Sequence, residues 1–167
     1  VRAAATLTNW TRRKIELDLA AEFDGAEAAR QSVTLEPRAT VEIELPIDLA
    51  KSVKLWSCEK PELYTVRVTA AGVDRIERVG FRKLETKGVK ILLNGEPLRL
   101  LGVNRHNEVT DMGFAVQGQH IARDMAIIRD LGCNAVRGSH YPNDPLVLDY
   151  CDELGLVFWE EVAFWGH

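Results

Sequence analysis

The sequence predicts two folds in one chain: an immunoglobulin-like β-sandwich over residues 1–84, then an α/β segment over residues 85–167. Three observations support this. In the first part, apolar residues alternate with polar ones, which is typical of half-buried antiparallel strands. In the second part, apolar runs alternate with helical spacing, which indicates parallel strands joined by crossover helices. Each of the last three apolar runs ends in polar residues, as strands do at the mouth of a (β/α) barrel.

The first part contains several runs with a period of two. Residues 15–23, 41–45 and 64–70 each place an apolar side chain at every second position. Ala71-Gly72 then turns the chain into a further strand that runs toward Phe81. Five to seven short strands with polar turns predict the sandwich. Its carboxylates fall on the solvent faces of strands, so we expect no catalysis there.

The second part opens with a hairpin. Asn94-Gly95 suits a type I′ turn, because both positions tolerate positive φ angles. The second arm, 98–103, is an apolar run that we expect to continue as one buried strand up to the polar residues 104–108.

Two amphipathic helices and two more strands follow. The first helix has apolar residues at helical spacing and a glycine at its end, and the second begins at an Asn-Asp-Pro cap and ends at another glycine. The apolar positions are Ile121, Met125, Ile128 and Leu131 before Gly132, and Val147, Cys151 and Leu154 before Gly155. The strands are expected at 134–138 and 156–159.

Composition excludes several classes of partner. The 167 residues are 46% hydrophobic and 28% charged, which is typical of a globular protein. A net charge of −4 and a pI near 5.6 argue against nucleic acid or an anionic membrane surface. No apolar run approaches the roughly 18 residues of a membrane span. Cys58, Cys133 and Cys151 lack metal-ligand spacing. The chain opens at Val1, so the compartment stays open.

Polar side chains at three strand ends form the candidate site. Parallel strands bring their C-terminal ends to the same side of a sheet, so these side chains should converge on a ligand. Glu160 and Glu161 are adjacent on an extended chain, so at most one of them faces the pocket. Taken singly, Arg137 could equally form a structural ion pair and His140 cap a loop. The converging residues are Asn104, His106, Arg137, His140, Glu160 and Glu161.

The run Asn-Ala-Val-Arg-Gly-Ser-His-Tyr-Pro at 134–142 resembles the signature of glycoside hydrolase family 2, the β-galactosidase and β-glucuronidase family. The similarity extends through 151–156 and back through 93–97 and 102–106, while 56–64 and 80–83 look like the end of the preceding immunoglobulin-like domain. The resemblance implies the first three β-strands and two helices of a truncated (β/α)8 TIM barrel.

The resemblance also implies roles for site residues. It implies that His106 and His140 bind the sugar ring, that Arg137 shapes the pocket, that Glu161 lies at its floor, and that Asn104 contributes. The acid/base and the nucleophile of this family follow strands four and seven. We therefore expect no catalytic residue in this chain and no hydrolysis by it alone.

The resemblance gives no cofactor. An acidic magnesium ligand follows strand three in the best-known β-galactosidases, but Trp165 holds that position here, with His167 two residues later. We therefore expect no magnesium site of that type. The tail around Trp165 suits stacking on a sugar or simple packing equally well.

Several functions remain in competition. The leading one is a fragment of a retaining β-galactosidase-like enzyme whose partner is a β-linked sugar or oligosaccharide. Alternatives are a β-glucuronidase fragment, a non-catalytic structural or carbohydrate-contacting module, and a metal hydrolase using His106, His140, Glu161 and His167. A β-mannosidase fits less well. Exposed barrel surface would also favour a homodimer.

Overall fold

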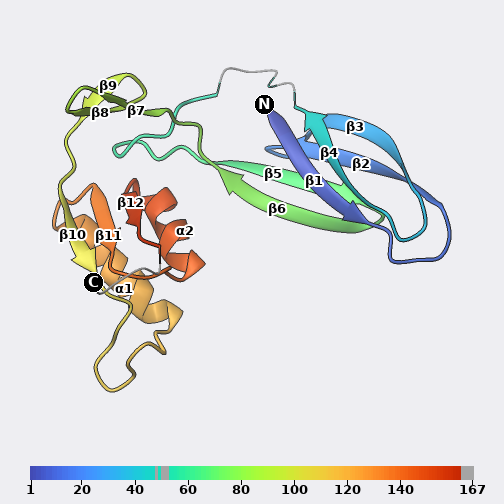
Figure 1. Cartoon of the computed structure of the whole chain (residues 1–167). Coiled ribbons are helices and arrows are strands. Elements are labelled where there is room, and N and C mark those ends of the chain that lie inside the picture. Colours follow the sequence, from blue (N-terminus) through green and yellow to red (C-terminus); the bar gives the residue numbers. More distant parts are fainter. Residues whose placement is uncertain (48, 50–52, 163–167) are drawn as a thin grey trace. The chain divides into compact units, whose positions relative to one another are not determined.

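The computed structural model describes residues 1–47, 49 and 53–162 (Figure 1). It divides into two compact units. The first comprises Val1–Lys54 and Tyr64–Val79, and the second comprises Leu55–Leu63 and Gly80–His167. Residues 55–63 therefore pack with the second unit although they precede part of the first in the chain. Neither helix among the described residues has the length and apolarity of a membrane span.

The first unit is a sandwich of two antiparallel sheets (Figure 1). One sheet pairs β1 (Arg2–Thr8) with β4 (Thr40–Pro46). The other has the order β3 (Ala26–Leu35), β2 (Ile15–Phe23), β5 (Tyr64–Ala70) and β6 (Val73–Val79). The alternation in the sequence explains the core, because the inward side chains of both sheets meet there. The buried members are Leu19, Ala21, Val33, Leu35, Leu45 and Ile47. The predicted sandwich is confirmed.

The second unit holds two further sheets. An antiparallel one joins β7 (Leu84–Lys87), β8 (Lys90–Leu93) and β9 (Glu96–Leu98). A parallel one has the order β10 (Gly102–Arg105), β11 (Ala135–Gly138) and β12 (Val157–Glu160). Helices α1 (Gly118–Asp130) and α2 (Pro145–Leu154) connect the parallel strands as crossovers. The α/β part predicted from the sequence is confirmed, whereas β7 was not predicted.

The helix ends follow from the residues predicted to form them. The Asp144 carboxylate caps α2 by accepting a hydrogen bond from the backbone N–H of Leu146 at 2.9 Å, and Pro145 opens the first turn. Gly155 ends α2 with φ of 72°. One apolar position was placed wrongly. Leu131 follows the last residue of α1 and is 69% exposed, because the buried face of that helix ends with Ile128.

The second arm of the hairpin is not one strand. β9 ends at Leu98 and β10 begins at Gly102, and residues 99–101 between them are irregular and exposed. The side chain of Asn134 forms hydrogen bonds with backbone groups of residues 99–101. Its side-chain oxygen accepts from the Leu101 N–H at 2.8 Å, and its amide donates to the Arg99 carbonyl at 2.9 Å. The predicted continuous strand over 98–103 is therefore wrong.

Candidate functional site

The parallel sheet places Arg137 at the centre of the candidate site. Arg137 on β11 lies level with Asn104 on β10 and with Trp159 on β12. Residues paired in this way in parallel strands project to the same face. The neighbouring Val136 projects to the other face, where it is buried in the core that also contains Ile121 and Val147. The sheet therefore has one face covered by helices and another that carries Asn104, Arg137 and Trp159.

Glu161 connects Arg137 to His140. The Arg137 guanidinium donates from Nε to Glu161 Oε1 at 2.8 Å, and its Nη2 forms an ion pair with the same oxygen at 2.6 Å. Glu161 Oε2 lies 3.0 Å from His140 Nδ1, and Arg137 Nη2 lies 3.3 Å from the same nitrogen. We call these three residues the Arg137–Glu161–His140 cluster. Two strand ends are thus joined by charge, since Arg137 lies on β11, His140 follows that strand and Glu161 follows β12.

The cluster keeps Glu161 ionised. The hydrogen bonds from Arg137 are the main cause that holds the pKa of Glu161 below its usual value of 4.5; burial opposes the shift, and the hydrogen bond with His140 adds to it. At neutral pH the Glu161 carboxylate is therefore ionised, accepts hydrogen bonds and is paired with the Arg137 guanidinium. It is poorly suited to act as a nucleophile or a proton donor.

Histidine and aromatic rings extend the site from the cluster. The rings of His106 and His140 meet edge to face with centroids 5.5 Å apart, and Tyr141 lies 6.4 Å from His106. Phe114 packs against Tyr141 at 5.4 Å. The Tyr141 hydroxyl accepts a hydrogen bond from the Asn107 N–H at 3.1 Å. The backbone N–H of Ser139 also donates to the Arg105 carbonyl at 3.1 Å, which draws the ends of β10 and β11 together.

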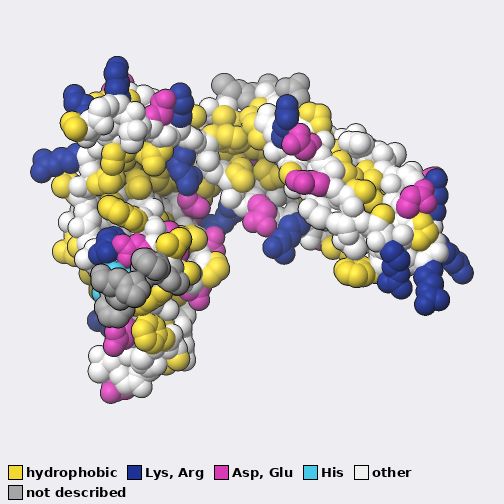
Figure 2. Space-filling model, in the orientation of Figure 1, with side chains coloured by type: hydrophobic (Ala, Val, Ile, Leu, Met, Phe, Trp, Pro, Cys, Tyr) yellow, Lys and Arg dark blue, Asp and Glu magenta, His cyan; other side chains and the backbone are white. Residues whose placement is uncertain are grey.

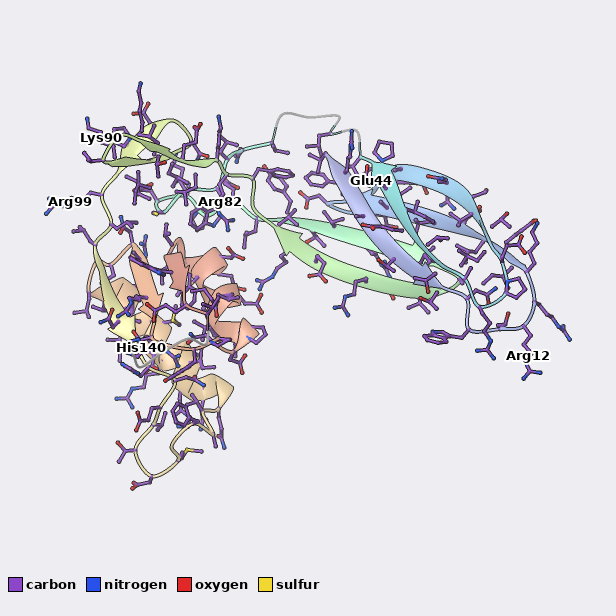
Figure 3. All side chains as sticks on the ribbon, viewed as in Figure 1. Arg12, Glu44, Arg82, Lys90, Arg99 and His140 are labelled. Carbon is purple, nitrogen blue, oxygen red and sulfur yellow. The ribbon has the colours of Figure 1, made fainter. Side chains whose placement is uncertain are left out.

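The five predicted site residues occupy one edge of the sheet. His106, Arg137, His140 and Glu161 are linked through the contacts above, and Asn104 is exposed at the level of Arg137. Figure 3 labels His140 close to the tip of the β10 arrow, and Figure 2 shows histidine surface beside basic and acidic side chains of the same unit. Their convergence was predicted, whereas their contact with a ligand stays a prediction.

The two adjacent glutamates separate as expected. Glu160 accepts a hydrogen bond from the backbone N–H of Asn143 at 3.0 Å, away from the cluster. Only Glu161 joins Arg137 and His140. Arg105 also projects away from the cluster, and its buried guanidinium pairs with Asp124 of α1 at 3.1 Å.

Sequence reasoning missed Tyr141 and Phe114 as parts of the site. Tyr141 stands inside the strand-end run 134–142, so its position next to His140 was an available signal. Phe114 lies between β10 and α1, in a stretch without periodicity. Its contact with Tyr141 depends on how that stretch folds back, which no local pattern indicated.

A cavity of about 340 Å³ lies elsewhere in the second unit. Its walls come from Trp56 and Arg82, from β7 and β8, and from α2 and β12, including Leu148 and Phe158. None of His106, Arg137, His140 and Glu161 lines it. The candidate site is therefore a separate feature at the ends of the parallel strands.

Metal ligation has little support in the described part of the chain. Residues 1–47, 49 and 53–162 contain no group of three or more His, Cys, Asp or Glu side chains arranged to hold a metal ion. Trp165 and His167, on which the magnesium and metal-hydrolase hypotheses depended, lie outside the described residues. The chemistry that the cluster supports is hydrogen bonding to a polar ligand.

Two family models match the chain. The model described as "Glycosyl hydrolases family 2, TIM barrel domain" matches residues 84–167, and the one described as "Glycosyl hydrolases family 2" matches residues 1–82. Together they cover both units.

Curated relatives and solved structures agree with these matches. A putative β-glucuronidase from Formosa agariphila is 42% identical over 120 residues, and a β-galactosidase from Actinobacillus pleuropneumoniae is 35% identical over 117 residues. These alignments cover 68% and 70% of this chain but 15% and 12% of the relatives. The structure of a β-galacturonidase from Eisenbergiella tayi bound to galacturonate has a TM-score of 0.86 and 36% identity, over 96% of this chain and 29% of that one. The chain thus spans a minor part of the length of each.

Proposed function

Because the chain belongs to glycosyl hydrolase family 2, we propose that it is part of a retaining exo-β-glycosidase that hydrolyses terminal β-linked sugars, with a β-galactoside as substrate. The observation that carries the proposal is the meeting of His106, His140 and the Arg137–Glu161 pair at the C-terminal ends of parallel strands. That edge is where (β/α) barrels bind their substrates. The proposal needs no cofactor, since a pair of carboxyl groups carries out retaining glycoside hydrolysis.

Within this proposal, His106, His140 and Asn104 contact the sugar, while Arg137 and Glu161 hold the site in shape. His106 and Asn104 are exposed and His140 is half-buried at the same edge, so these three can reach a ligand. Arg137 and Glu161 form an ion pair with each other, so neither charge is left for the sugar. Aromatic rings such as Tyr141 and Phe114 provide apolar surface beside the polar groups, which suits the mixed character of a sugar ring.

Charge favours a neutral sugar. A uronic acid needs a cation for its carboxylate, and the two arginines of β10 and β11 are both paired, Arg137 with Glu161 and Arg105 with Asp124. A β-glucuronide or related uronide is the second candidate. It is favoured by the names of the Formosa agariphila relative and of the Eisenbergiella tayi structure.

We further propose that the 167-residue chain does not hydrolyse glycosides by itself. Retaining glycosidases use two carboxyl groups about 5–5.5 Å apart. Among the described residues, the cluster supplies one carboxylate, that of Glu161, and Arg137 and His140 both engage it. A sugar could therefore bind at this edge without being cleaved by the residues described.

Titration with galactose and with glucuronate, followed by amide chemical shifts, tests the sugar-binding proposal. Galactose should shift amides in 104–107 and 137–141 with saturation, and His140→Ala should abolish that response. His120→Ala is the matched control, because His120 lies on α1 and contacts the Gln117 backbone. Shifts confined to other regions would refute the site, and a stronger response to glucuronate would establish the second candidate.

Hydrolysis is tested separately on chromogenic β-galactosides and β-glucuronides. We expect no turnover by the purified chain. A rate that follows the concentration of the chain through purification would refute the proposed lack of activity.

A further inference from the structure

We propose that one end of the β-sandwich is a docking surface for an anionic polysaccharide, which binds to an exposed tryptophan and three arginines. The surface, which we call the basic tip, comprises residues 9–14 and 36–39. These loops join β1 to β2 and β3 to β4, and the pairing of the strands brings both loops to the same end of the first unit. Only the choice of a saccharide among polyanions rests on the proposed function.

The basic tip is cationic although the protein is acidic. Its two loops carry four basic residues and a single acidic one, Glu36, whereas the whole chain has a net charge of −4. Glu36 pairs with Lys14 at 3.5 Å. Arg12, Arg13 and Arg38 are exposed, and no carboxylate among the described residues forms an ion pair with them. Their guanidinium groups are therefore available to an anionic partner.

The figures show where this charge lies. Figure 2 shows basic side chains gathered at one end of the first unit, where Figure 3 labels Arg12. This is the end at which β1 stops and β2 begins.

Asn9 holds the two loops of the basic tip together. It is 1% exposed. Its side-chain amide donates to the backbone carbonyls of Arg13 at 2.8 Å and Glu36 at 3.0 Å, so it joins one loop to the other. Its side-chain oxygen accepts from the Thr11 N–H at 2.9 Å and from the Thr11 hydroxyl at 2.8 Å. The residues on both sides of Trp10 are thereby fixed, and a preordered surface loses little conformational entropy when it binds.

Trp10 makes the surface suitable for a saccharide. Its side chain is 76% exposed, two positions before Arg12. An indole can stack on the apolar face of a sugar ring while neighbouring guanidinium groups bind charged substituents. The combination fits a polymer that carries both sugar rings and carboxylates or sulfate esters. Single-stranded nucleic acid also combines rings with charge, so it is the competing occupant that the test must exclude.

Arg38 occupies a backbone position that usually favours glycine. The turn over 36–39 is closed by the Ala39 N–H, which donates to the Glu36 carbonyl at 3.1 Å, and Arg38 is its third residue with φ of 61°. Glycine would adopt this conformation at lower cost. Stability alone therefore does not explain an arginine here, whereas a role for its charge at the surface does.

Affinity electrophoresis of the 167-residue chain in native gels tests the proposal. Polygalacturonate in the gel supplies carboxylates, λ-carrageenan supplies sulfate esters, and neutral galactan supplies sugar rings without charge. We expect retardation in at least one of the anionic gels and none in the neutral gel. Added salt should abolish the retardation, because salt screens exposed charges. The anionic gel that retards the chain more identifies the preferred charged group.

Two variants test the residues of the basic tip. Trp10→Ala should weaken binding about two- to tenfold, the factor for one lost aromatic contact. Arg38→Gly should weaken it about two- to fivefold without lowering the midpoint of urea denaturation, because glycine tolerates the positive φ. Arg75→Gln is the matched control, since Arg75 is an exposed arginine of the first unit that pairs with Glu77 at 3.1 Å. It should leave the retardation unchanged.

Three results would overturn the proposal. The first is no retardation in either anionic gel. The second is unchanged binding by Trp10→Ala, or a loss in Arg75→Gln equal to that in Arg38→Gly, because binding would then reflect general charge. The third is displacement by a single-stranded oligothymidylate at a lower concentration than by an oligomer of the retarding polysaccharide, which would reassign the surface to nucleic acid.

His140→Ala separates this proposal from the proposed function. The substitution lies in the candidate site of the second unit and should not change the retardation. If the anionic gels retard the chain and galactose produces no response at residues 137–141, the basic tip stands and the proposed sugar site fails.

Discussion

Glu160 and Glu161 show how much of this site is decided by single residues. The two have the same side chain and are adjacent at the end of β12, yet one bonds to the Asn143 backbone and the other to Arg137 and His140. The alternation of an extended chain predicted that only one would face the site. The sequence did not indicate that Glu161 would pair with Arg137, because that contact depends on the register between β11 and β12.

The ion pair of Arg137 belongs to the site itself. The sequence left open whether Arg137 makes a structural ion pair or shapes a pocket. In the structure its carboxylate partner, Glu161, is another predicted site residue, so the two interpretations describe one arrangement.

The pH dependence of stability tests the Arg137–Glu161 contact. A carboxyl group whose pKa is lower in the folded state stabilises the fold above its unfolded pKa, here near 4.5, and loses this contribution as the pH falls through the folded pKa. Wild type should therefore be more stable than Glu161→Gln at about pH 6, and the difference should shrink at about pH 3. Urea denaturation at several pH values measures it.

The control for this experiment is the same pair of measurements in an Arg137→Met background. Without the guanidinium the pH-dependent difference should largely disappear, because Arg137 is the main cause of the shift. A difference that grows as the pH falls would contradict the contact.

At the scale of elements, glycines with positive φ end both helices. Gly132 has φ of 80° after α1, and Gly155 has φ of 72° after α2. Their surroundings differ. A Cβ on Gly132 would meet nothing within 4 Å, whereas one on Gly155 would lie 2.3 Å from the Cys58 carbonyl oxygen. Gly155 therefore serves both the helix end and the close approach of residues 55–63.

Replacing each glycine with alanine separates the two effects. Gly132→Ala should reduce the free energy of unfolding by about 1–2 kcal/mol, the cost of a left-handed backbone for a residue with a Cβ. Gly155→Ala should cost about 1–3 kcal/mol more, because the backbone at Cys58 must move. Guanidinium denaturation of both variants checks this. Equal losses would refute the close approach as a source of strain.

The elements that carry their own signals were predictable from the sequence. Capping residues and apolar spacing located both helices, and alternation located the strands of the sandwich. The break at 99–101 was not predictable, because Asn134, more than thirty residues away, takes over the backbone hydrogen bonds there. β7 was missed since Leu84–Lys87 is short and only one of its four residues is partly buried.

At the scale of the whole molecule, the change of pattern after Lys83 correctly indicated a second fold. The sequence did not indicate that residues 55–63 pack with the second unit. Trp56 is buried in the second unit, donates from its indole Nε1 to the Asp152 carbonyl at 2.8 Å, and lies under the Arg82 guanidinium at 5.0 Å. The hydrogen bond to Asp152 joins residues 96 positions apart, which is beyond the reach of local patterns.

The second unit also exposes apolar side chains around its parallel sheet. Trp159 is 64% exposed, and Val103 and Leu101 are also exposed. In the described part of the chain, β10 and β12 each pair on one side only, with β11. Unpaired strand edges beside apolar surface favour association between copies.

We therefore predict that the chain self-associates at micromolar concentration and that Trp159→Ser shifts it toward the monomer. Sedimentation velocity over a concentration series measures both. Trp10→Ser is the control, because Trp10 is 76% exposed but lies in the first unit, and it should have little effect. A monomer at all concentrations, or a larger effect of Trp10→Ser, would contradict the prediction.

The hydrogen bonds of Asn134, at the N-terminal ends of β10 and β11, affect which side chains meet at the C-terminal ends of these strands. Its hydrogen bonds to residues 99 and 101 fix the register between β10 and β11. They do so at positions that come just before the first paired residues of the two strands. A slip of one position would interchange the two faces of β10, turning Arg105 outward and Asn104 toward the helices. The side-chain amide of Asn134 therefore determines that Asn104 lies beside Arg137, although Asn134 itself is not part of the candidate site.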